Sequence, residues 1–451
     1  MYDYWKRSRI TKALTDASRV GSFAEAESRL NAIFVTVVVD ADQAATAAGQ
    51  AAALTAISTA QKCFGRVVLV LEADVFLVAR LPVGKTLKEA AKQIGASTST
   101  EVHADTTHTI FIGSNSAGAG HRIYCWWDRW LAGLRNSREI IGDSRLALSG
   151  VFSAALAVRQ VFASILTGKK PRNDSTVSLW TPWSAANLSE TGPEFFDVPD
   201  QFWFLGLGHL GQGFVWNLCL MGMAGGRAII QDDQVVAEEN EATSLLVGGK
   251  DLGQKKVRVA ERWLSAAGWN ADLVERRHYG DIILRAEDPP YLLCGVDDVA
   301  PRQVMAGHGF EFMIDAGLGH GPYDFEGIQI RVVGKNGKFD DLWEKKKAAS
   351  SANNDGKLDV NLENARKQST PYQDLEKSIG SCGIVKFAEA STSVPFVGAA
   401  AGALVIGYAI RLASLKSTPR FIQMELGAPH LTSSGGLVNS SVGLGSLTKR
   451  L

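Results

Sequence analysis

The segment from Phe204 to Asn240, FLGLGHLGQGFVWNLCLMGMAGGRAIIQDDQVVAEEN, constrains the fold more than any other part of this chain. It holds an apolar run, a G-x-G-x-x-G loop at Gly206, Gly208 and Gly211, a helical pattern, and a second apolar run that ends at Asp232. This order predicts a strand, a tight turn, a helix and a parallel strand. Gly206 permits the turn, Gly208 lets backbone approach a phosphate, and the helix N-terminus supplies N–H groups. Asp232 is placed to accept hydrogen bonds from ribose hydroxyls.

The glycine loop by itself leaves several interpretations open. Glycine also lets a helix pack closely against a sheet, which is the structural alternative. A dehydrogenase uses the same layout to hold a dinucleotide, and other phosphate-containing ligands fit it equally well. The residues that follow the loop have to separate these possibilities.

The first half of the chain alternates strands and helices but has no glycine loop. AIFVTVVVD (32–40) is apolar and β-branched and predicts a buried strand, 43–64 predicts a helix, and 65–74 predicts the next strand. HTIFIG (108–113) predicts another strand, and 144–166 predicts a long apolar helix. Units of this βαβ kind build parallel sheets. Because no glycine loop follows the first strand, no phosphate cradle is predicted in this half.

The second half has the same rhythm. After the glycine loop, YLLCGVDD (291–298) and FEFMIDAGLG (310–319) predict strands, and PFVGAAAGALVIGYAIRLA (395–413) predicts a late Gly/Ala-rich helix like that of the first half. We therefore predict an α/β fold in which one unit is used twice, with phosphate chemistry kept only in the second copy.

A chain of 451 residues is too long for one ordinary core, so two domains are expected. A stretch rich in Pro, Ser, Thr and Asn predicts a linker over 167–200, between a domain at 1–166 and a domain at 201–451. A polar, low-complexity stretch predicts a crossover segment over 338–381, and the C-terminal end from 433 reads as a flexible tail.

Composition excludes some partners and favours one compartment. Lys plus Arg equals Asp plus Glu at 47 each, so no nucleic-acid footprint is expected. The N-terminus lacks an apolar signal core, and five cysteines without a C-x-x-C pair indicate a reducing, cytoplasmic setting and no zinc site. The segment 395–413 has a marginal length for a membrane span, and a buried core helix explains it as well, so no membrane is expected.

Two charged residues downstream favour a triphosphate over a dinucleotide. Lys256 follows a glycine at the start of an amphipathic helix, where a point charge offsets charge that develops on phosphate. Asp297 comes just after a predicted strand, at the carboxyl edge where α/β sheets bind ligands, and a carboxylate near a triphosphate holds magnesium. The structural alternatives are a solvated helix start for Lys256 and a helix cap for Asp297.

Together these pieces resemble the ThiF-type adenylating family, which includes the activating enzymes for ubiquitin and ubiquitin-like proteins. The family pattern joins a glycine loop, an acidic strand end, an Asn-x-x-Arg-Gln segment, a G-x-x-K helix start and a D-N-x-x-x-R segment. The matching positions here are Gly206, Gly208 and Gly211, then Asp232, Asn240–Ser244, Gly253–Lys256 and Asp297–Arg302. The resemblance covers most of 202–415. It implies two Rossmann-like adenylation-type domains, the first degenerate and the second active, each with a mainly parallel sheet flanked by helices. It also implies that Asn240 and Lys256 contact ATP and that Asp297 holds Mg²⁺.

One position departs from the family pattern. Where the family has an arginine that meets the terminal phosphates, this chain has Thr243. In relatives built from two adenylation-like halves, an arginine near the start of the inactive half reaches into the active one. The resemblance therefore makes Arg7 and Arg9, in YWKRSRI, the candidate catalytic replacements.

The family resemblance also points to one catalytic cysteine. Relatives carry a cysteine after the crossover and before the final helix, and Cys382 in KSIGSCGIVKF holds that place, although the surrounding sequence differs. An accessible thiolate is the nucleophile in such chemistry. The structural alternative is a cysteine that packs as a small hydrophobe.

The resemblance as a whole implies an activating enzyme for a ubiquitin-like protein. ATP and Mg²⁺ would activate the partner's C-terminus, a thioester would form on Cys382, and a conjugating enzyme would receive the acyl group. The two-half layout resembles the activating enzymes of bacterial ubiquitin-like conjugation operons, some of which are tied to antiviral defence. A sulfur-carrier adenylyltransferase, an NAD-dependent oxidoreductase and an inactive scaffold remain as alternatives.

Overall fold

The computed structural model describes most of the chain. The described residues are 6–114, 117–168, 174–184, 190–319, 324–335, 337, 342–343, 369–377, 392–414, 416–438 and 448–450. Cys382 and most of the predicted crossover segment lie outside these ranges.

The first half builds a seven-stranded sheet in the order β5-β2-β1-β6-β7-β8-β9. Its strands are β1 (Val35–Val39), β2 (Val67–Val70), β5 (Ser97–Ser99), β6 (His108–Ile112), β7 (His121–Asp128), β8 (Leu131–Arg135) and β9 (Ser175–Ser178). Pairing is parallel from β5 to β7 and antiparallel for β8 and β9. Every residue of β1 is buried, as a β-branched run in the middle of a parallel sheet should be. A hairpin of β3 (Phe76–Leu81) and β4 (Gly84–Thr86) follows β2.

The second half builds an eight-stranded sheet in the order β13-β12-β11-β14-β15-β16-β17-β18. Its strands are β11 (Gln201–Leu205), β12 (Arg227–Gln231), β13 (Asn270–Val274), β14 (Tyr291–Cys294), β15 (Phe312–Leu318), β16 (Gly327–Gly334), β17 (Phe421–Glu425) and β18 (Ser433–Gly435). Pairing is parallel from β13 to β15 and antiparallel from β15 to β18.

The two sheets repeat one topology strand by strand. The order β13-β12-β11-β14-β15-β16-β17 matches β5-β2-β1-β6-β7-β8-β9 in both position and direction. The helices repeat as well, in the pairs α4 (Ala47–Phe64) with α7 (His209–Leu220), α5 (Leu87–Ile94) with α9 (Lys256–Ala266), and α6 (Ala147–Thr167) with α14 (Pro395–Ala413). The prediction of one α/β unit used twice is confirmed.

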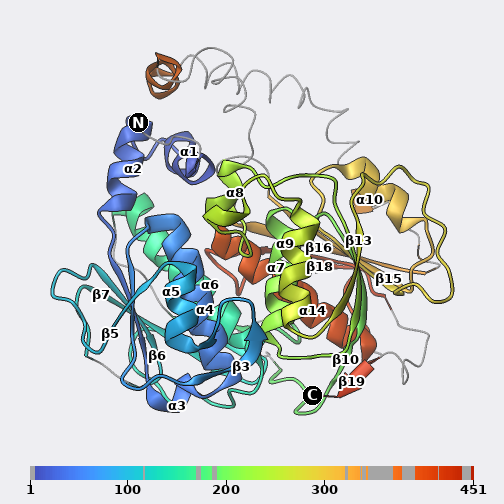
Figure 1. Cartoon of the computed structure of the whole chain (residues 1–451), viewed down its shortest axis with the longest axis horizontal. Coiled ribbons are helices and arrows are strands. Elements are labelled where there is room, and N and C mark those ends of the chain that lie inside the picture. Colours follow the sequence, from blue (N-terminus) through green and yellow to red (C-terminus); the bar gives the residue numbers. More distant parts are fainter. Residues whose placement is uncertain are drawn as a thin grey trace.

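The long helices pack together between the two sheets (Figure 1). Glycines make this approach possible. A Cβ at Gly150 of α6 would lie 2.0 Å from the Ala48 carbonyl oxygen of α4, and a Cβ at Gly402 of α14 would lie 2.2 Å from the Gly213 oxygen of α7. The Gly/Ala richness of the late helices is therefore a packing requirement. One hydrophobic core cluster runs through both halves.

Burial explains the two helices that resemble membrane spans. Among the described residues, α6 and α14 are long and apolar enough to cross a membrane by length and composition. The apolar window of α14 is 94% buried inside the protein and that of α6 is 61% buried. Core helices of this kind pass the same test, so the two segments are weak evidence for a membrane.

Of the two N-terminal helices, α1 (Ser8–Asp16) lies beside the short helix α8 (Glu238–Thr243) of the second half, and α2 (Phe23–Asn31) packs on α1 (Figure 1). A helical stretch at 370–377 contacts both N-terminal helices through Tyr372. Its Tyr372 is buried between the Lys12–Asp16 ion pair and the ring of Phe23.

Two segments predicted to be irregular contain short strands. Within the predicted linker 167–200, β9 belongs to the first sheet, and β10 (Asp197–Pro199) precedes β11. In the predicted tail, β18 pairs with β17, and β19 (Thr448–Arg450) pairs with β10. The domain boundaries drawn from the sequence remain predictions.

Candidate active site

The glycine loop lies at the carboxyl end of β11, and each of its glycines meets a different requirement. Gly206 has a φ of +81°, which favours glycine at this turn. A Cβ on Gly211 would lie 1.9 Å from the Gly206 carbonyl oxygen, so this glycine is required by packing. A Cβ on Gly208 would meet nothing within 4 Å. Gly208 is also the N-cap of α7 and makes no side-chain cap, so it leaves the first N–H groups of α7 without a cap from its own side chain, as a phosphate site at a helix N-terminus requires.

Asp232 ties the loop to the next strand. Its Oδ2 accepts a hydrogen bond of 2.6 Å from the Leu207 amide, and its Oδ1 accepts one of 2.7 Å from the Gln234 amide. The half-buried carboxylate thus fixes the shape of the glycine loop. The ribose contact predicted for Asp232 remains a prediction, and the oxygens retain further lone pairs for it.

Lys256 is the first residue of α9 and is buried, with 5% of its surface exposed. Its Nζ donates a hydrogen bond of 2.6 Å to Gln234 Oε1. Burial lowers the pKa of Lys256, the carboxylates of Asp232 and Asp297 raise it, and the nearby Arg9 guanidinium lowers it. The charged groups of Lys256, Asp232, Asp297 and Arg9 therefore lie close enough to interact. Lys256 is not a solvent-exposed residue at a helix start, which was the structural alternative.

Asp297 and Asp298 follow β14 and have different roles. Asp298 caps α10 (Val299–Ala306) by accepting from the Ala300 amide at 3.2 Å. Asp297 is exposed and faces the neighbourhood of Lys256. The helix cap, which was the structural alternative for Asp297, is therefore made by its neighbour.

The buried residue Arg302 holds the loop that carries Asp297. Its guanidinium donates to the Val296 carbonyl through two nitrogens and pairs with the buried Asp315 at 3.3 Å. The carboxylate of Asp315 also pairs with Arg331 at 3.4 Å. Burial raises the pKa of Asp315, and the two arginines oppose that rise. The network fixes the backbone immediately before Asp297.

Helix α8 carries Asn240 and Thr243. Asn240 Oδ1 accepts from the Ala237 amide at 2.9 Å, which starts the helix and leaves the side-chain NH₂ as a donor. The Thr243 hydroxyl donates to the Glu239 carbonyl at 2.9 Å, so it is used inside α8. Thr243 is buried and has no charge, and it cannot replace an arginine.

The two candidate arginines of the first half separate in space. Arg9 pairs with Glu239 of α8 at 3.6 Å and acts on the pKa of Lys256. Arg7 turns the other way, donating to the Cys63 carbonyl at 3.2 Å and to Asn31 Oδ1 at 2.6 Å. It also pairs with Glu27. The fold therefore brings Arg9 to the glycine-loop site and keeps Arg7 within the first half.

The sequence interpretation overlooked His209. This residue opens α7, and its Nδ1 lies 2.7 Å from the Thr243 carbonyl oxygen, so Nδ1 carries the proton. Burial lowers the pKa of His209 to about 4, which keeps the ring neutral. The ring also lies against Gly398 of α14. A histidine between the loop glycines was a visible signal, but its partners come from distant segments.

Four of the five cysteines are unsuited to nucleophilic chemistry. Cys63, Cys125, Cys219 and Cys294 are buried. Burial raises the pKa of each thiol, that of Cys125 to about 12. A thiol with a raised pKa supplies almost no thiolate near neutral pH. Cys382, the predicted nucleophile, lies outside the described residues.

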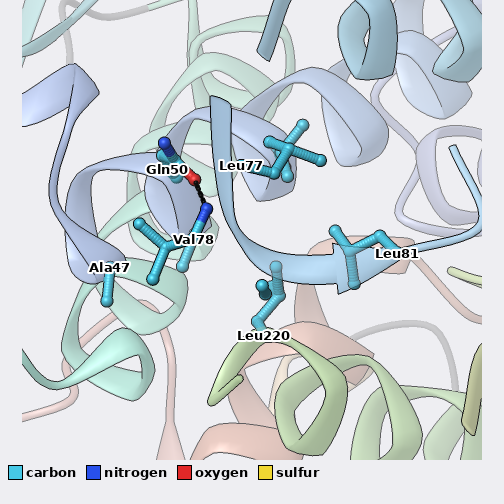
Figure 2. Close-up of a pocket in the computed structure, with 9 residues that line it drawn as sticks. Ala47, Gln50, Leu77, Val78, Leu81 and Leu220 are labelled. Carbon is cyan, nitrogen blue, oxygen red and sulfur yellow. Dashed lines mark hydrogen bonds between the residues drawn. The ribbon is translucent and has the colours of Figure 1, made fainter. Parts of the chain in front are cut away.

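A small hollow lies elsewhere, between α4, β3 and the C-terminal end of α7 (Figure 2). It is partly open to solvent, and the centre of a water molecule can occupy only about 10 Å³ of it. The amide of Gln50 is its one polar side chain, and that amide is engaged with the backbone of Val78, Ala44 and Phe76. Leu220 is at the opposite end of α7 from the glycine loop, roughly 16 Å away at 1.5 Å per residue. The hollow is separate from the candidate site.

Comparison with protein families matches both halves of the chain. One family model, the BilD C-terminal domain, matches residues 198–415, and another, the BilD N-terminal domain, matches residues 34–179. The bacterial E1-like protein BilD of Collimonas sp. (strain OK412) is 29% identical over 425 residues, which are 91% of this chain and 89% of that protein. An uncharacterized protein, y4jF, of Sinorhizobium fredii (strain NBRC 101917 / NGR234) is 28% identical over 34% of this chain and 28% of its own length.

Similar solved structures are more distant. A crystal structure of PaaA matches with a TM-score of 0.24 and 17% identity, over 29% of this chain and 40% of that chain. The crystal structure of E. coli MccB with AMPCPP and MccA matches with a TM-score of 0.34 and 12% identity, over 54% of this chain and 65% of that one. This chain therefore spans less than two thirds of either solved chain.

The two BilD domain models follow one another along the chain in the order of its two halves. The full-length relative aligns across both of them. This chain is therefore similar to the BilD domain models in both halves and to the bacterial E1-like protein BilD over most of its length.

Proposed function

We propose that this chain is an ATP-dependent activating enzyme for a small ubiquitin-like protein. The observation that carries the proposal is the convergence of an uncapped glycine loop, the buried Lys256 and the exposed Asp297 at the carboxyl edge of the second sheet. The E1-like relative supports it. A dinucleotide site would leave Lys256 and Asp297 without a purpose.

Each charged residue has a role in the proposed adenylation. The triphosphate lies over Gly208, where the N–H groups of α7 donate to phosphate oxygens. A carboxylate oxygen of the partner's C-terminus bonds to the α-phosphorus as the bond from that phosphorus to the pyrophosphate oxygen breaks. Lys256 and Arg9 stabilise the negative charge that develops on the phosphates. Arg9 takes over the role of the family arginine, whose position is occupied by Thr243 in this chain.

Asp297 is the proposed magnesium ligand. No group of three or more His, Cys, Asp or Glu side chains fit for a metal occurs within the described ranges. Magnesium usually binds through one or two carboxylates and substrate phosphates, so a single exposed carboxylate fits it. When bound, the ion offsets phosphate charge during displacement.

Thioester formation is the proposed second step. The sulfur of Cys382 bonds to the acyl carbon, and AMP leaves with the electron pair of the broken C–O bond. The four buried cysteines support this choice by elimination, because their raised pKa values keep them protonated. The acyl group then passes to a conjugating enzyme.

Pyrophosphate exchange tests the first step. The protein should catalyse exchange between pyrophosphate and ATP in the presence of Mg²⁺ and a cognate ubiquitin-like protein. Lys256→Ala should lower the exchange rate about 100-fold or more, because one electrostatic donor to the transition state is lost. Asp297→Ala should lower it and change the magnesium dependence, whereas Asp298→Ala, which removes a helix cap and an exposed ion pair of 3.9 Å with Arg277, is the matched control. Normal exchange in both Lys256→Ala and Asp297→Ala would place the active site elsewhere.

A non-reducing gel tests the second step. Cys382→Ala should retain pyrophosphate exchange and lose the reductant-sensitive adduct with the partner protein. Cys382→Ser should give an adduct that survives reductant. An adduct that persists in Cys382→Ala would move the nucleophile to another residue. Exchange without any adduct in the wild type would favour an adenylyltransferase of the sulfur-carrier type.

A further inference from the structure

Helix α8 depends on residues outside itself. It has only six residues, Glu238–Thr243, and a helix this short is unstable alone in water. It nevertheless sets three features of the candidate site. It carries Asn240, and it places Glu239 beside Arg9. The carbonyl of its Thr243 accepts a hydrogen bond from His209 of the glycine loop. Whatever fixes α8 therefore influences the site.

The first half supplies a half-buried cation to this helix. Lys62, in the last turn of α4, donates from Nζ to the Glu241 carbonyl at 2.7 Å and to the Val247 carbonyl at 2.7 Å. One acceptor is near the C-terminal end of α8, where a helix presents unpaired carbonyls and partial negative charge. The other closes the loop that follows α8. One ammonium group thus joins the two ends of the segment from 241 to 247.

Other contacts hold the same segment from both halves. Lys6 of the first half pairs with the Glu241 carboxylate at 2.7 Å. From the second half, Gln212 accepts from the Leu246 amide at 3.0 Å, and Trp263 donates to the Leu246 carbonyl at 3.2 Å. Lys6 is half-exposed, so its ion pair contributes little, whereas the two hydrogen bonds of Lys62 are partly buried and less screened by solvent.

We propose that Lys62 is a positioning residue through which the catalytically silent first half holds α8 in place for adenylation in the second half. This inference rests on the proposed function. Lys62 contacts two backbone carbonyls and acts on the nucleotide through α8.

The charge state of Lys62 gives a readout that packing alone would not. Burial lowers the pKa of Lys62 to about 8. The Glu241 and Asp251 carboxylates and the Cys63 thiol oppose this effect, and Lys6 adds to it. The ammonium group therefore loses its proton as the pH rises through about 8, and the charge-assisted bonds to α8 weaken. An arginine at this position keeps its charge over the same range.

The test compares Lys62→Met, Lys62→Arg and the control Lys88→Met, whose lysine makes one long contact of 3.4 Å on an exposed surface of the same half. Lys62→Met should raise amide hydrogen exchange across 238–247 and leave β1 protected. It should also lower pyrophosphate exchange about tenfold, from the loss of charge-assisted hydrogen bonds. Lys62→Arg should retain pyrophosphate exchange, and the decline of the exchange rate at alkaline pH should move to higher pH. If Lys62→Met unfolds, Lys62→Gln provides the same comparison.

The outcomes separate this inference from the proposed function. Unchanged protection of 238–247 in Lys62→Met would overturn it, and so would loosened protection with unaltered pyrophosphate exchange. If Lys62→Arg does not shift the pH at which pyrophosphate exchange declines, that decline belongs to another group, such as Lys256. This result would reject the role of the Lys62 charge. A wild-type protein without pyrophosphate exchange would reject the proposed function, while hydrogen exchange would still decide whether Lys62 fixes α8.

Discussion

The N-cap of the long helix that follows the first strand differs between the two halves, although the sheets share one topology. In the first half the N-cap of α4 is Thr46, whose hydroxyl accepts from the Gly49 amide at 3.0 Å. In the second half the N-cap of α7 is Gly208, which has no side chain to do this. The first copy thus satisfies its helix N-terminus internally, and the second leaves those N–H groups for a ligand.

A second glycine is common to both copies. Gly49 and Gly211 are each the third residue of their helix, and a Cβ on either would lie close to a carbonyl oxygen of the segment before that helix, 2.0 Å from that of Gln43 and 1.9 Å from that of Gly206. This glycine belongs to the fold. Gly208, with open space beside it, is the one that distinguishes a ligand site from a packed turn.

The largest expected effect comes from replacing Gly208, the N-cap of α7, with threonine, the residue type that caps α4 in the first half. Gly208→Thr should lower pyrophosphate exchange about 1,000-fold, because a side chain fills the phosphate space and competes for N–H groups that stabilise charge. The free energy of unfolding should stay level or rise, since no neighbour lies within 4 Å of the new Cβ. Calorimetric titration with ATP and thermal unfolding measure the two effects. ATP binding that survives the change would show that Gly208 does not face the phosphates.

An intermediate effect should separate the two arginines of the first half. Arg9→Ala should lower pyrophosphate exchange about tenfold, as expected for the loss of about 1.4 kcal/mol of transition-state stabilisation. Arg7→Ala should leave the rate near wild type, because its partners are Glu27, Asn31 and Cys63. The two single variants are matched controls for each other. Equal losses of pyrophosphate exchange in the two variants would mean that both arginines act by stabilising the N-terminal segment, and that Arg9 has no separate role in catalysis.

The smallest expected effect is confined to stability. Thr46→Ala should lower the free energy of unfolding by about 1 kcal/mol, the usual cost of losing an N-cap. Pyrophosphate exchange should not change, since this helix end carries no proposed ligand. Urea unfolding monitored by fluorescence gives the first quantity. A clear loss of activity in a folded Thr46→Ala protein would argue that the first half has a ligand site of its own.

Local sequence patterns predicted most of the fold. The β-branched run at β1 and the apolar run at β11 became central strands because parallel sheets bury both faces. The duplication also followed from local patterns, since each copy repeats strand, helix and strand in order. Short strands such as β9 and β19 were not predicted, because three or four polar residues become a strand only when a partner edge is available.

The candidate site was predictable only in part. Gly206, Gly208, Asp232, Lys256 and Asp297 are held by local turns and strand ends, so their spacing in the sequence was informative. The roles of Arg9, His209 and Lys62 depend on partners in distant segments. Their side chains gave no periodic or motif signal of what they would contact.

The sequence by itself determined the glycine loop, the alternation of elements and the absence of an arginine at residue 243, because each depends on neighbouring residues. Only the tertiary structure decided that Arg9 rather than Arg7 reaches the site, and that Lys62 supports α8. It also assigned the helix cap to Asp298 and left Asp297 exposed. The physical reason is that a long cationic side chain is directed by the surfaces that close around it. Those surfaces form only when the two halves pack against each other.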